Sequence, residues 1–253
     1  MSGIITRRAL LTTGALGAGA LLSGCDKFVA NPLGRKLVFS GETLNYQLAR
    51  ALTNRDSLAK EYRPDQMSPI FRVNGTANPN TPTYNAMVAE NFANWRLKVG
   101  GLVNRPLDIS HADLLAMPAR TQITRHDCVE GWSAIGKWHG PMLGTILKAA
   151  DVRSTARYIV FTCADLYSGH NYYESIDLID AFHPQTILAW AMNDRLLSVA
   201  HGAPIRLRLE RQLGYKNAKY VMAVDAVDSL SKIGKGKGGY WEDAIDYDWY
   251  AGI

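Results

Sequence analysis

Cysteine is scarce in this chain, and the spacings of cysteine and histidine that mark common metal sites are missing. Its 253 residues include three cysteines, Cys25, Cys128 and Cys163, and six histidines. No CxxC or HExxH spacing marks a zinc site, and no CxxCH marks a c-type haem. So few cysteines exclude a disulfide framework, although a single Cys128–Cys163 bridge is the ordinary expectation in an oxidising compartment.

Two further absences narrow the function. No GxGxxG stretch opens a helix after a strand, so a dinucleotide-binding fold has no support. Basic residues form no stripe interleaved with aromatics, which argues against a nucleic-acid partner. The formal net charge is +5, and it falls to about +3 when the first 24 residues leave with Arg7 and Arg8. Hydrophobic residues make up 47% of the chain, enough for a full core.

The N-terminus has the features of an export signal. Arg7 and Arg8 precede a short apolar run, rich in glycine and alanine, that ends near Leu22. The arginine pair indicates the twin-arginine route for folded proteins, with an ordinary signal that contains two arginines as the alternative. The run is too short and too rich in glycine for a comfortable transmembrane helix. Residues 1–24 are therefore predicted to be a signal peptide.

A lipid anchor is predicted where this signal ends. Residues 21–25, LLSGC, resemble a bacterial lipobox, and Asp26 resembles the signal that keeps lipoproteins on the inner membrane. Acyl chains on Cys25 would hold the protein at the membrane without spanning it. The alternative is cleavage by the general signal peptidase after a small residue. The predicted location is periplasmic, with a lipid anchor in the inner membrane.

The mature chain is predicted to contain an N-terminal helix and linker arm over residues 25–72 and one domain over residues 73–253. Leu44, Leu48, Leu52 and Leu58 lie near helical spacing, which predicts a helix over 41–62 with Ser40 as its cap. Residues 63–84 are rich in proline and asparagine, as expected of an extended arm.

Strand-like and helix-like patterns alternate irregularly from about residue 94. Ser110 is predicted to cap a short helix that Pro118 ends, and a second helix is predicted over 141–150. Strands are predicted over 95–103, 120–128, 156–164, 171–178, 186–193, 204–213 and 218–230. Short strands mixed with a few helices indicate the α+β class, with mixed sheets in a single domain.

The residues around Cys128 pose the main chemical question. Residues 124–140 read TRHDCVEGWSAIGKWHG. The cysteine could form the bridge to Cys163, or act as a nucleophile whose thiolate Arg125 and His126 stabilise. It could also be a soft thiolate ligand of a transition metal whose other ligands come from a cofactor. The local pattern leaves these roles open.

Several stretches, in order, resemble the sulfite-oxidase-type molybdopterin domain. RHDCVEGWS is followed by HPQTILAWAMNDRLL and then by HGAPIRLRLERQLGYKNAKYVMAV. Within that family they resemble the small periplasmic protein-methionine-sulfoxide reductases, over roughly residues 74–228. The resemblance implies the sulfite-oxidase-type fold, a molybdenum–molybdopterin cofactor and Cys128 as the thiolate ligand of the metal. A metal-bound thiolate would exclude the bridge to Cys163.

The resemblance also implies which residues hold the cofactor. Arg206 and Lys219 match cationic positions that contact the pterin and its phosphate, and a guanidinium fork with an ammonium suits an oxyanion. A surface salt bridge is the alternative for Arg206, and a turn-forming role is the alternative for Asn74. Cys163 and His201 depart from the threonine and asparagine that these reductases often carry. The other implied contacts are Asn74, Cys163, His201, and the backbone of Asn217 and Ala218.

Near the substrate, the resemblance points to Glu130, Arg125 and Tyr172. Glu130, two residues after the ligand, would hydrogen-bond an oxo or water ligand of the metal. Arg125 would place positive charge beside an S–O or N–O group. Tyr172 resembles the pocket tyrosine of the family, with Tyr173 as the alternative. Trp132 and Trp138 are candidates for the pocket wall, with core packing as the alternative for either. His183 recurs in the family motif and is expected to be structural.

The expected function is oxygen-atom transfer at sulfur or nitrogen by an exported enzyme, in the direction of sulfoxide or N-oxide reduction. A sulfite oxidase-like dehydrogenase is one alternative, and a non-catalytic lipoprotein that keeps the fold as a binding module is another. No haem is expected in the chain, so a membrane haem subunit or a soluble cytochrome would exchange electrons with it. The chain after Asp228 leaves no room for the family's dimerisation domain, which predicts a monomer.

Overall fold

A computed structural model describes residues 28–253, so the predicted signal peptide and Cys25 lie outside the described residues. The chain divides into two compact units, residues 1–52 and 53–253. The described part of the first unit is helix α2 (Pro32–Leu52), which begins with a proline, where the missing N–H costs nothing. The helix begins and ends earlier than predicted. Ser40 does not cap it but lies inside it, where its Oγ donates to the Leu37 carbonyl at 2.6 Å.

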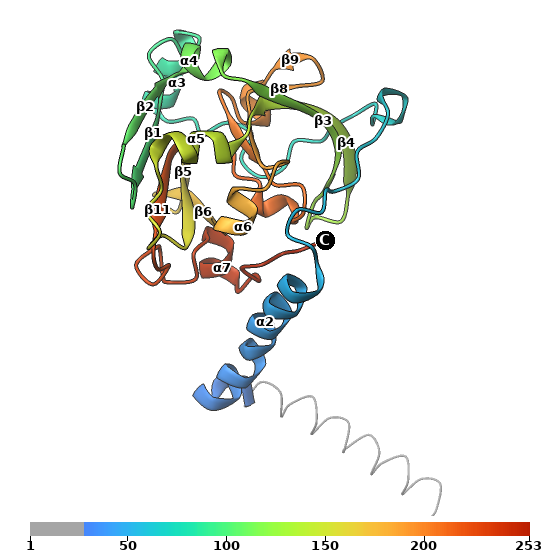
Figure 1. Cartoon of the computed structure of the whole chain (residues 1–253), viewed down its shortest axis with the longest axis vertical. Coiled ribbons are helices and arrows are strands. Elements are labelled where there is room, and N and C mark those ends of the chain that lie inside the picture. The colour runs from blue at the N-terminus through green and yellow to red at the C-terminus, as the bar shows by residue number, and fades with distance from the viewer. Residues whose placement is uncertain (1–27) are drawn as a thin grey trace, which may run out of the picture. The chain divides into compact units, whose positions relative to one another are not determined.

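The second unit is built on three sheets, which confirms the α+β class (Figure 1). In the largest sheet the strand order is β2-β1-β11-β5-β6, where β1 and β11 are parallel and the other neighbours are antiparallel. Its strands are β1 (Arg96–Gly101), β2 (Leu107–Ser110), β5 (Tyr158–Tyr167), β6 (His170–Asp177) and β11 (Val221–Val227).

The other two sheets are antiparallel and carry the motifs of the sequence. The order in the four-stranded sheet is β3-β4-β8-β9, and β10 pairs with β7. Their bounds are β3 (Ala119–Asp127), β4 (Ser133–Pro141), β8 (Ala191–Met192), β9 (Arg195–Leu196), β7 (Ile187–Ala189) and β10 (Arg206–Arg208). The strand predicted over 204–213 is therefore only three residues long, and β4 was not predicted.

Short helices connect these strands. Ser110 caps α4 as predicted, because its Oγ accepts a hydrogen bond from the Asp113 N–H at 3.1 Å. The second predicted helix is also present, as α5. The helices are α3 (Pro82–Ala89), α4 (His111–Ala116), α5 (Leu143–Ala150), α6 (Leu178–Ala181) and α7 (Tyr240–Ile245), with 3-10 turns η1 (Pro64–Gln66), η2 (Val199–His201) and η3 (Gly214–Lys216).

The arm that follows α2 belongs to the second unit and runs along its four-stranded sheet. The Tyr62 N–H donates to the Ile123 carbonyl at 2.9 Å, and the Ser68 N–H donates to the Ile135 carbonyl at 3.0 Å. His183 Nε2 contacts the Ser57 carbonyl at 3.0 Å, which is a structural role of the kind expected for this histidine. These bonds fix the arm beside β3 and β4, so Phe71 and the residues after it reach the candidate site.

Candidate active site

Cys128 lies at the tip of the β3–β4 hairpin. The two strands pair without interruption from Ala119–Pro141 to Asp127–Ser133, so residues 128–132 form the connecting loop. The Cys128 N–H donates to the Trp132 carbonyl at 2.9 Å, and the Gly131 N–H donates to the Cys128 carbonyl at 3.0 Å. Gly131 has φ +86°, a left-handed conformation that glycine adopts at low cost. The Cys-Val-Glu-Gly-Trp spacing is therefore a tight hairpin turn that holds the thiol.

The residue Cys128 is 8% exposed, and it does not pair with Cys163, because both cysteines are free. Burial raises the pKa of the Cys128 thiol, while the nearby Arg206 guanidinium acts in the opposite direction. A thiol whose pKa is raised is a poor nucleophile without further activation. A bound metal would remove its proton outright, which favours a ligand role over a nucleophilic one.

Arg206 is a fully buried cation. It comes from β10, and its two hydrogen bonds within the described residues go to the main-chain carbonyls of His201 and Asn217, both at 3.2 Å. Its Nε has no partner among these residues. Burial and the neighbouring Arg208 lower the pKa of Arg206 to about 9. A buried guanidinium without a directly bonded carboxylate is costly, so this arrangement suits a site that receives an anion.

Lys219 adds a second buried cation of the same kind. Its Nζ donates to the carbonyls of Asn74 at 2.6 Å, of Ala200 at 3.0 Å, and of Thr76. Burial, together with Arg206, lowers the pKa of Lys219 to about 7. The ammonium ties the arm to the loop after η3, and it lines a cavity between them. Two buried cations without a bonded acid match an anionic group such as a phosphate.

The same cavity brings together five of the residues expected from the family resemblance: Asn74, Tyr172, Asn217, Ala218 and Lys219. Asn217 and Asn74 make hydrogen bonds within the protein. The side chain of Asn217 is used within the loop, since its Oδ1 accepts from the Leu209 N–H at 2.8 Å. The backbone carbonyl of Asn74, rather than its amide, bonds Lys219.

Asp165 also lines this cavity and was not anticipated. Its Oδ1 is buried and has no hydrogen-bond partner in the described part of the chain. Burial raises the pKa of Asp165 to about 6. A pterin ring carries N–H donors, so a buried carboxyl oxygen that lacks a partner fits such a ring.

The pairing of His126 with Arg208 was also not anticipated, since the sequence had suggested His126 only as a stabiliser of a Cys128 thiolate. Arg208 Nη1 donates to His126 Nδ1 at 2.8 Å, and Glu210 holds Arg208 through two bonds of 2.6 and 3.1 Å. Because a guanidinium only donates, the hydrogen of the neutral imidazole must sit on Nε2. That buried Nε2–H has no partner within residues 28–253. Burial, reinforced by Arg208, keeps the pKa of His126 well below its usual value.

The imidazole of His126 lies against the loop that carries the cavity residues. A Cβ on Gly214 would come within 2.5 Å of His126 Nε2, so only glycine allows this approach. The sequence carried a weak signal for these contacts, because charged residues alternate at Arg206 and Arg208 in β10 and at Glu210 just after it. That alternation is usual for a solvent-facing edge, yet here both faces of the strand are buried.

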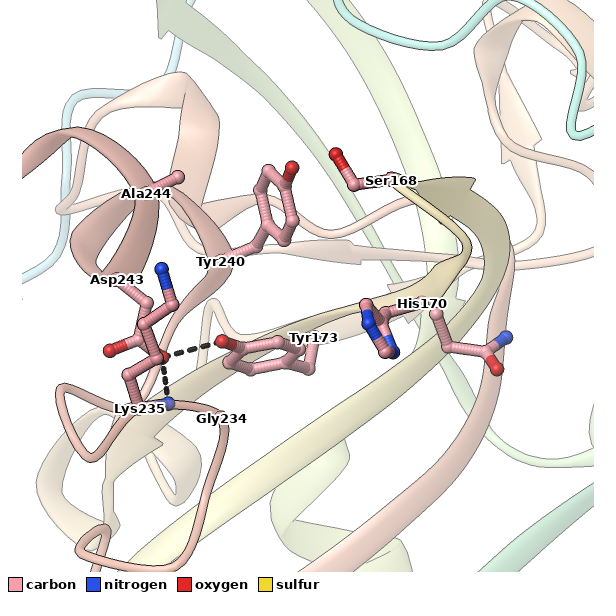
Figure 2. A pocket seen from close by; sticks show the side chains of 9 residues that line it. Ser168, His170, Tyr173, Gly234, Lys235, Tyr240, Asp243 and Ala244 are labelled. Carbon is pink, nitrogen blue, oxygen red and sulfur yellow. Dashed lines mark hydrogen bonds between the residues drawn. The ribbon is translucent and has the colours of Figure 1, made fainter.

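The two candidate tyrosines face different cavities. Tyr172 is 6% exposed, lines the cavity of Lys219, and donates to the Tyr215 carbonyl at 2.9 Å. Tyr173 lines an open pocket of about 660 Å³ and donates to Asp243 Oδ2 at 2.5 Å (Figure 2). Tyr240 also lines the open pocket, and its ring centroid is 4.9 Å from that of Tyr167, which lines the other cavity. Aromatic rings therefore separate the two spaces.

The remaining expected residues lie outside that cavity. Arg125 is largely exposed and bonds Asp127 at 2.8 Å, which raises the pKa of its guanidinium. Glu130 is exposed at the hairpin tip and accepts from Trp132 Nε1 at 2.9 Å. Cys163 has no exposed surface, and burial raises the pKa of its thiol well above the usual value. His201 Nε2 contacts the Phe71 carbonyl at 3.2 Å.

The two tryptophans divide between site and core. Trp138 is fully buried under the guanidinium of Arg208, 4.3 Å from the ring centroid, so it packs in the core beneath the cations. Trp132 is only partly buried and packs on His126, with ring centroids 5.5 Å apart. Of the two, Trp132 is the one that remains available as a wall of the site.

We expect Lys219 to make the stability of the cofactor-free protein depend on pH. The folded-state pKa of about 7 lies below the unfolded value of about 10.4, so the folded state binds fewer protons. Below about pH 7 the buried ammonium is charged, and burying this charge lowers the free energy of unfolding by its full amount. This loss is relieved as the pH rises towards about 10. Denaturation of cofactor-free protein at several pH values should show stability rising over this range relative to Lys219→Met. Parallel curves for the two proteins would contradict this assignment.

Comparison with known proteins agrees with this geometry. Residues 84–232 match the oxidoreductase molybdopterin binding domain family. A candidate protein-methionine-sulfoxide reductase subunit, YedZ1, from Azospira oryzae is 35% identical over 257 residues, covering 97% of this chain and 87% of the relative. The protein-methionine-sulfoxide reductase catalytic subunit MsrP from Campylobacter jejuni is 29% identical over 182 residues, covering 66% of this chain and 59% of the relative.

A second MsrP and one solved structure extend the comparison. MsrP from Xanthomonas axonopodis is 34% identical over 147 residues, covering 54% of this chain and 46% of the relative, so the chain matches about half the length of these MsrP proteins. The crystal structure of the sulfane dehydrogenase SoxCD from Paracoccus pantotrophus matches with a TM-score of 0.50 and 22% identity, over 54% of this chain and 39% of that one. This likeness shows a shared fold. The chain belongs to the oxidoreductase molybdopterin binding domain family and is a molybdopterin-dependent oxidoreductase of the sulfite-oxidase type.

Proposed function

We propose that the protein is an exported reductase that removes the oxygen atom from methionine-sulfoxide-type substrates, with N-oxides as related substrates. The observation that carries this proposal is the pairing of Cys128 and Glu130 on one hairpin tip beside two buried cations, Arg206 and Lys219. The names of the MsrP and YedZ1 relatives support the choice of sulfoxides over sulfite.

The described residues fit molybdopterin. Cys128 would bind the metal through its thiolate, and Arg206 and Lys219 would receive the anionic part of the pterin. Asp165 Oδ1 and the Nε2–H of His126 are buried and lack partners within the described residues, so they would hydrogen-bond the cofactor. Molybdopterin supplies a two-electron metal centre that accepts an oxygen atom. The protein would contribute position and electrostatics to this chemistry.

Glu130 is the residue proposed to handle protons. Reduction of a sulfoxide releases its oxygen as water, so two protons must reach that oxygen. Glu130 stands two residues after Cys128, is exposed to solvent, and is oriented by Trp132 Nε1. A carboxyl group in this position can pass protons from solvent to the site. Arg125 is paired with Asp127, so we assign it the weaker role of adding positive charge at the rim.

The proposed site would also use Tyr172, His201 and the backbone of residues 217–218. Tyr172 would close one side of the cofactor cavity, since its ring lines that space and its hydroxyl is fixed on Tyr215. His201 would act through its carbonyl, which holds Arg206 at 3.2 Å. Cys163 is proposed to pack behind the cavity, because it has no exposed surface.

The cellular setting follows from the N-terminal sequence. We propose export by the twin-arginine route to the periplasm, acylation of Cys25, and electron delivery to a monomer by a membrane haem subunit or a soluble cytochrome. No helix within residues 28–253 is both long and apolar enough to cross a membrane. We propose the acyl group on Cys25 as the attachment, with residues 1–24 removed and residues 25–52 preceding the second unit.

Steady-state assays of molybdenum-replete enzyme test the reaction and its direction. We expect oxidation of reduced viologen by methionine sulfoxide to be faster than reduction of an acceptor by sulfite. Glu130→Gln should lower kcat by about a hundredfold and change KM little, because general acid–base groups contribute about that much to turnover. Glu90→Gln, at an exposed acid outside the site, is the matched control. Faster sulfite oxidation would support the sulfite oxidase-like alternative instead.

A further inference from the structure

Helix α2 carries a continuous apolar stripe along its length. At about 100° per residue, its five leucines fall within an arc of about 100°. Each of them is more than half exposed: Leu33 78%, Leu37 67%, Leu44 69%, Leu48 55% and Leu52 78%. A soluble helix normally covers such a face, so a stripe of this size marks an interaction surface.

Charge is confined to the other side of the helix. On the same helical projection, no charged residue falls within about 100° of the centre of the leucine stripe. The charged residues of α2 are three bases and one acid: Arg35, Lys36, Arg50 and Glu42. The helix therefore separates an apolar face from a polar face with a net positive charge. This combination favours binding of the helix at a boundary between an apolar phase and water that carries negative charge.

The leucines follow a nearly straight line along the helix. Leu33 and Leu44 are eleven residues apart, and so are Leu37 and Leu48. An eleven-residue spacing shifts by only about 20° around an α-helix. A straight apolar stripe fits a flat surface, whereas the seven-residue spacing of Leu37 and Leu44 makes a second copy an outcome that the test must distinguish.

The position of α2 in the chain points to the same surface. Pro32 lies seven positions after Cys25, and a chain of that length spans at most about 25 Å. Acylation of Cys25 would therefore keep the start of the helix close to the bilayer. We propose that α2 lies on the surface of an anionic lipid bilayer, with its leucine stripe in the boundary between headgroups and acyl chains. The inference rests on the proposed export and anchoring and not on the catalytic proposal.

Vesicle binding by protein without the acyl group tests this inference. The mature chain with Cys25→Ser should sediment with vesicles of phosphatidylethanolamine and phosphatidylglycerol, and more weakly with phosphatidylcholine. Adding Leu44→Glu and Leu48→Glu should lower the partition coefficient at least about tenfold. The matched control adds Thr43→Glu and Gln47→Glu, which bring the same charge with the same spacing outside the stripe. In this control the partition coefficient should fall by about threefold or less.

Three results would overturn the inference. The first is that the Cys25→Ser chain does not bind vesicles, and the second is that the stripe and control variants lose binding equally. The third is a dimer in solution that the stripe variant alone dissociates, because a second copy would then cover the leucines. Sulfoxide reduction should be the same in all these proteins, so a failure of vesicle binding is separate from a failure of the proposed reaction.

Discussion

Replacing Cys128 with serine is expected to lower sulfoxide turnover at least about a thousandfold, to background. The cysteine is held at the hairpin tip by two backbone hydrogen bonds, so serine would keep the turn and lose only the soft thiolate. Steady-state turnover with reduced viologen as the donor measures the effect. The expected loss is in kcat, because the hairpin and the residues that would meet the substrate remain in place.

Cys163→Ala is the matched control for this experiment. It removes the other buried free thiol, which lies in the core on β5. This change should cost about 1 kcal/mol of stability and leave turnover within about threefold of the wild type. Normal turnover in Cys128→Ser, or equal losses in both variants, would contradict the assignment of Cys128 as the metal ligand.

Replacing Lys216 with methionine is expected to produce the largest loss of stability, about 3–5 kcal/mol. Lys216 lies in η3 and is fully buried between Glu174 on β6 and Glu242 on α7, with 2.7 Å to Glu242 Oε1. The second oxygen of each carboxyl has no partner within the described residues. Removing the cation would leave two buried acids facing each other. Chemical denaturation of the variant measures the change.

Glu174→Gln is the contrasting substitution, because it neutralises one of the two acids that bind Lys216. Burial, followed by repulsion from Glu242, raises the pKa of Glu174 well above its usual value, so its charged form is disfavoured in this position. A neutral amide of the same shape should therefore cost about 1 kcal/mol or less. A loss in Glu174→Gln as large as that in Lys216→Met would contradict the view that the buried charge of Glu174 is disfavoured. Because η3 leads directly into Asn217 and Lys219, Lys216→Met should also retain less cofactor.

The sequence predicted the features that depend on local pattern. Ser110 and Pro118 mark the ends of α4 because capping and termination act within a few residues. Apolar patterning located β1, β5, β6 and β11 of the large sheet for the same reason, whereas β2 was not predicted. The order of motifs around Cys128 and Arg206 indicated the family before their positions in space were known.

Features that depend on distant contacts were not predicted. Strand β4 was missed because its alternation is interrupted by glycines at 136 and 140, and its position depends on pairing with β3. The helix predicted over 41–62 ends ten residues early, at Leu52. Residues after Leu52 form hydrogen bonds within the second unit instead. His126 joins the site only because Arg208, far along the chain, fixes its tautomer. Such contacts leave no local periodic signal.

X-ray absorption at the molybdenum edge, combined with metal analysis, tests the central claim most directly. The full chain would be purified from a host that synthesises molybdopterin and compared with its Cys128→Ser variant. We predict about one molybdenum per wild-type chain, with one more sulfur neighbour in the wild type than in the variant. Absence of molybdenum from the wild type, or the same number of sulfur neighbours in both proteins, would contradict the account.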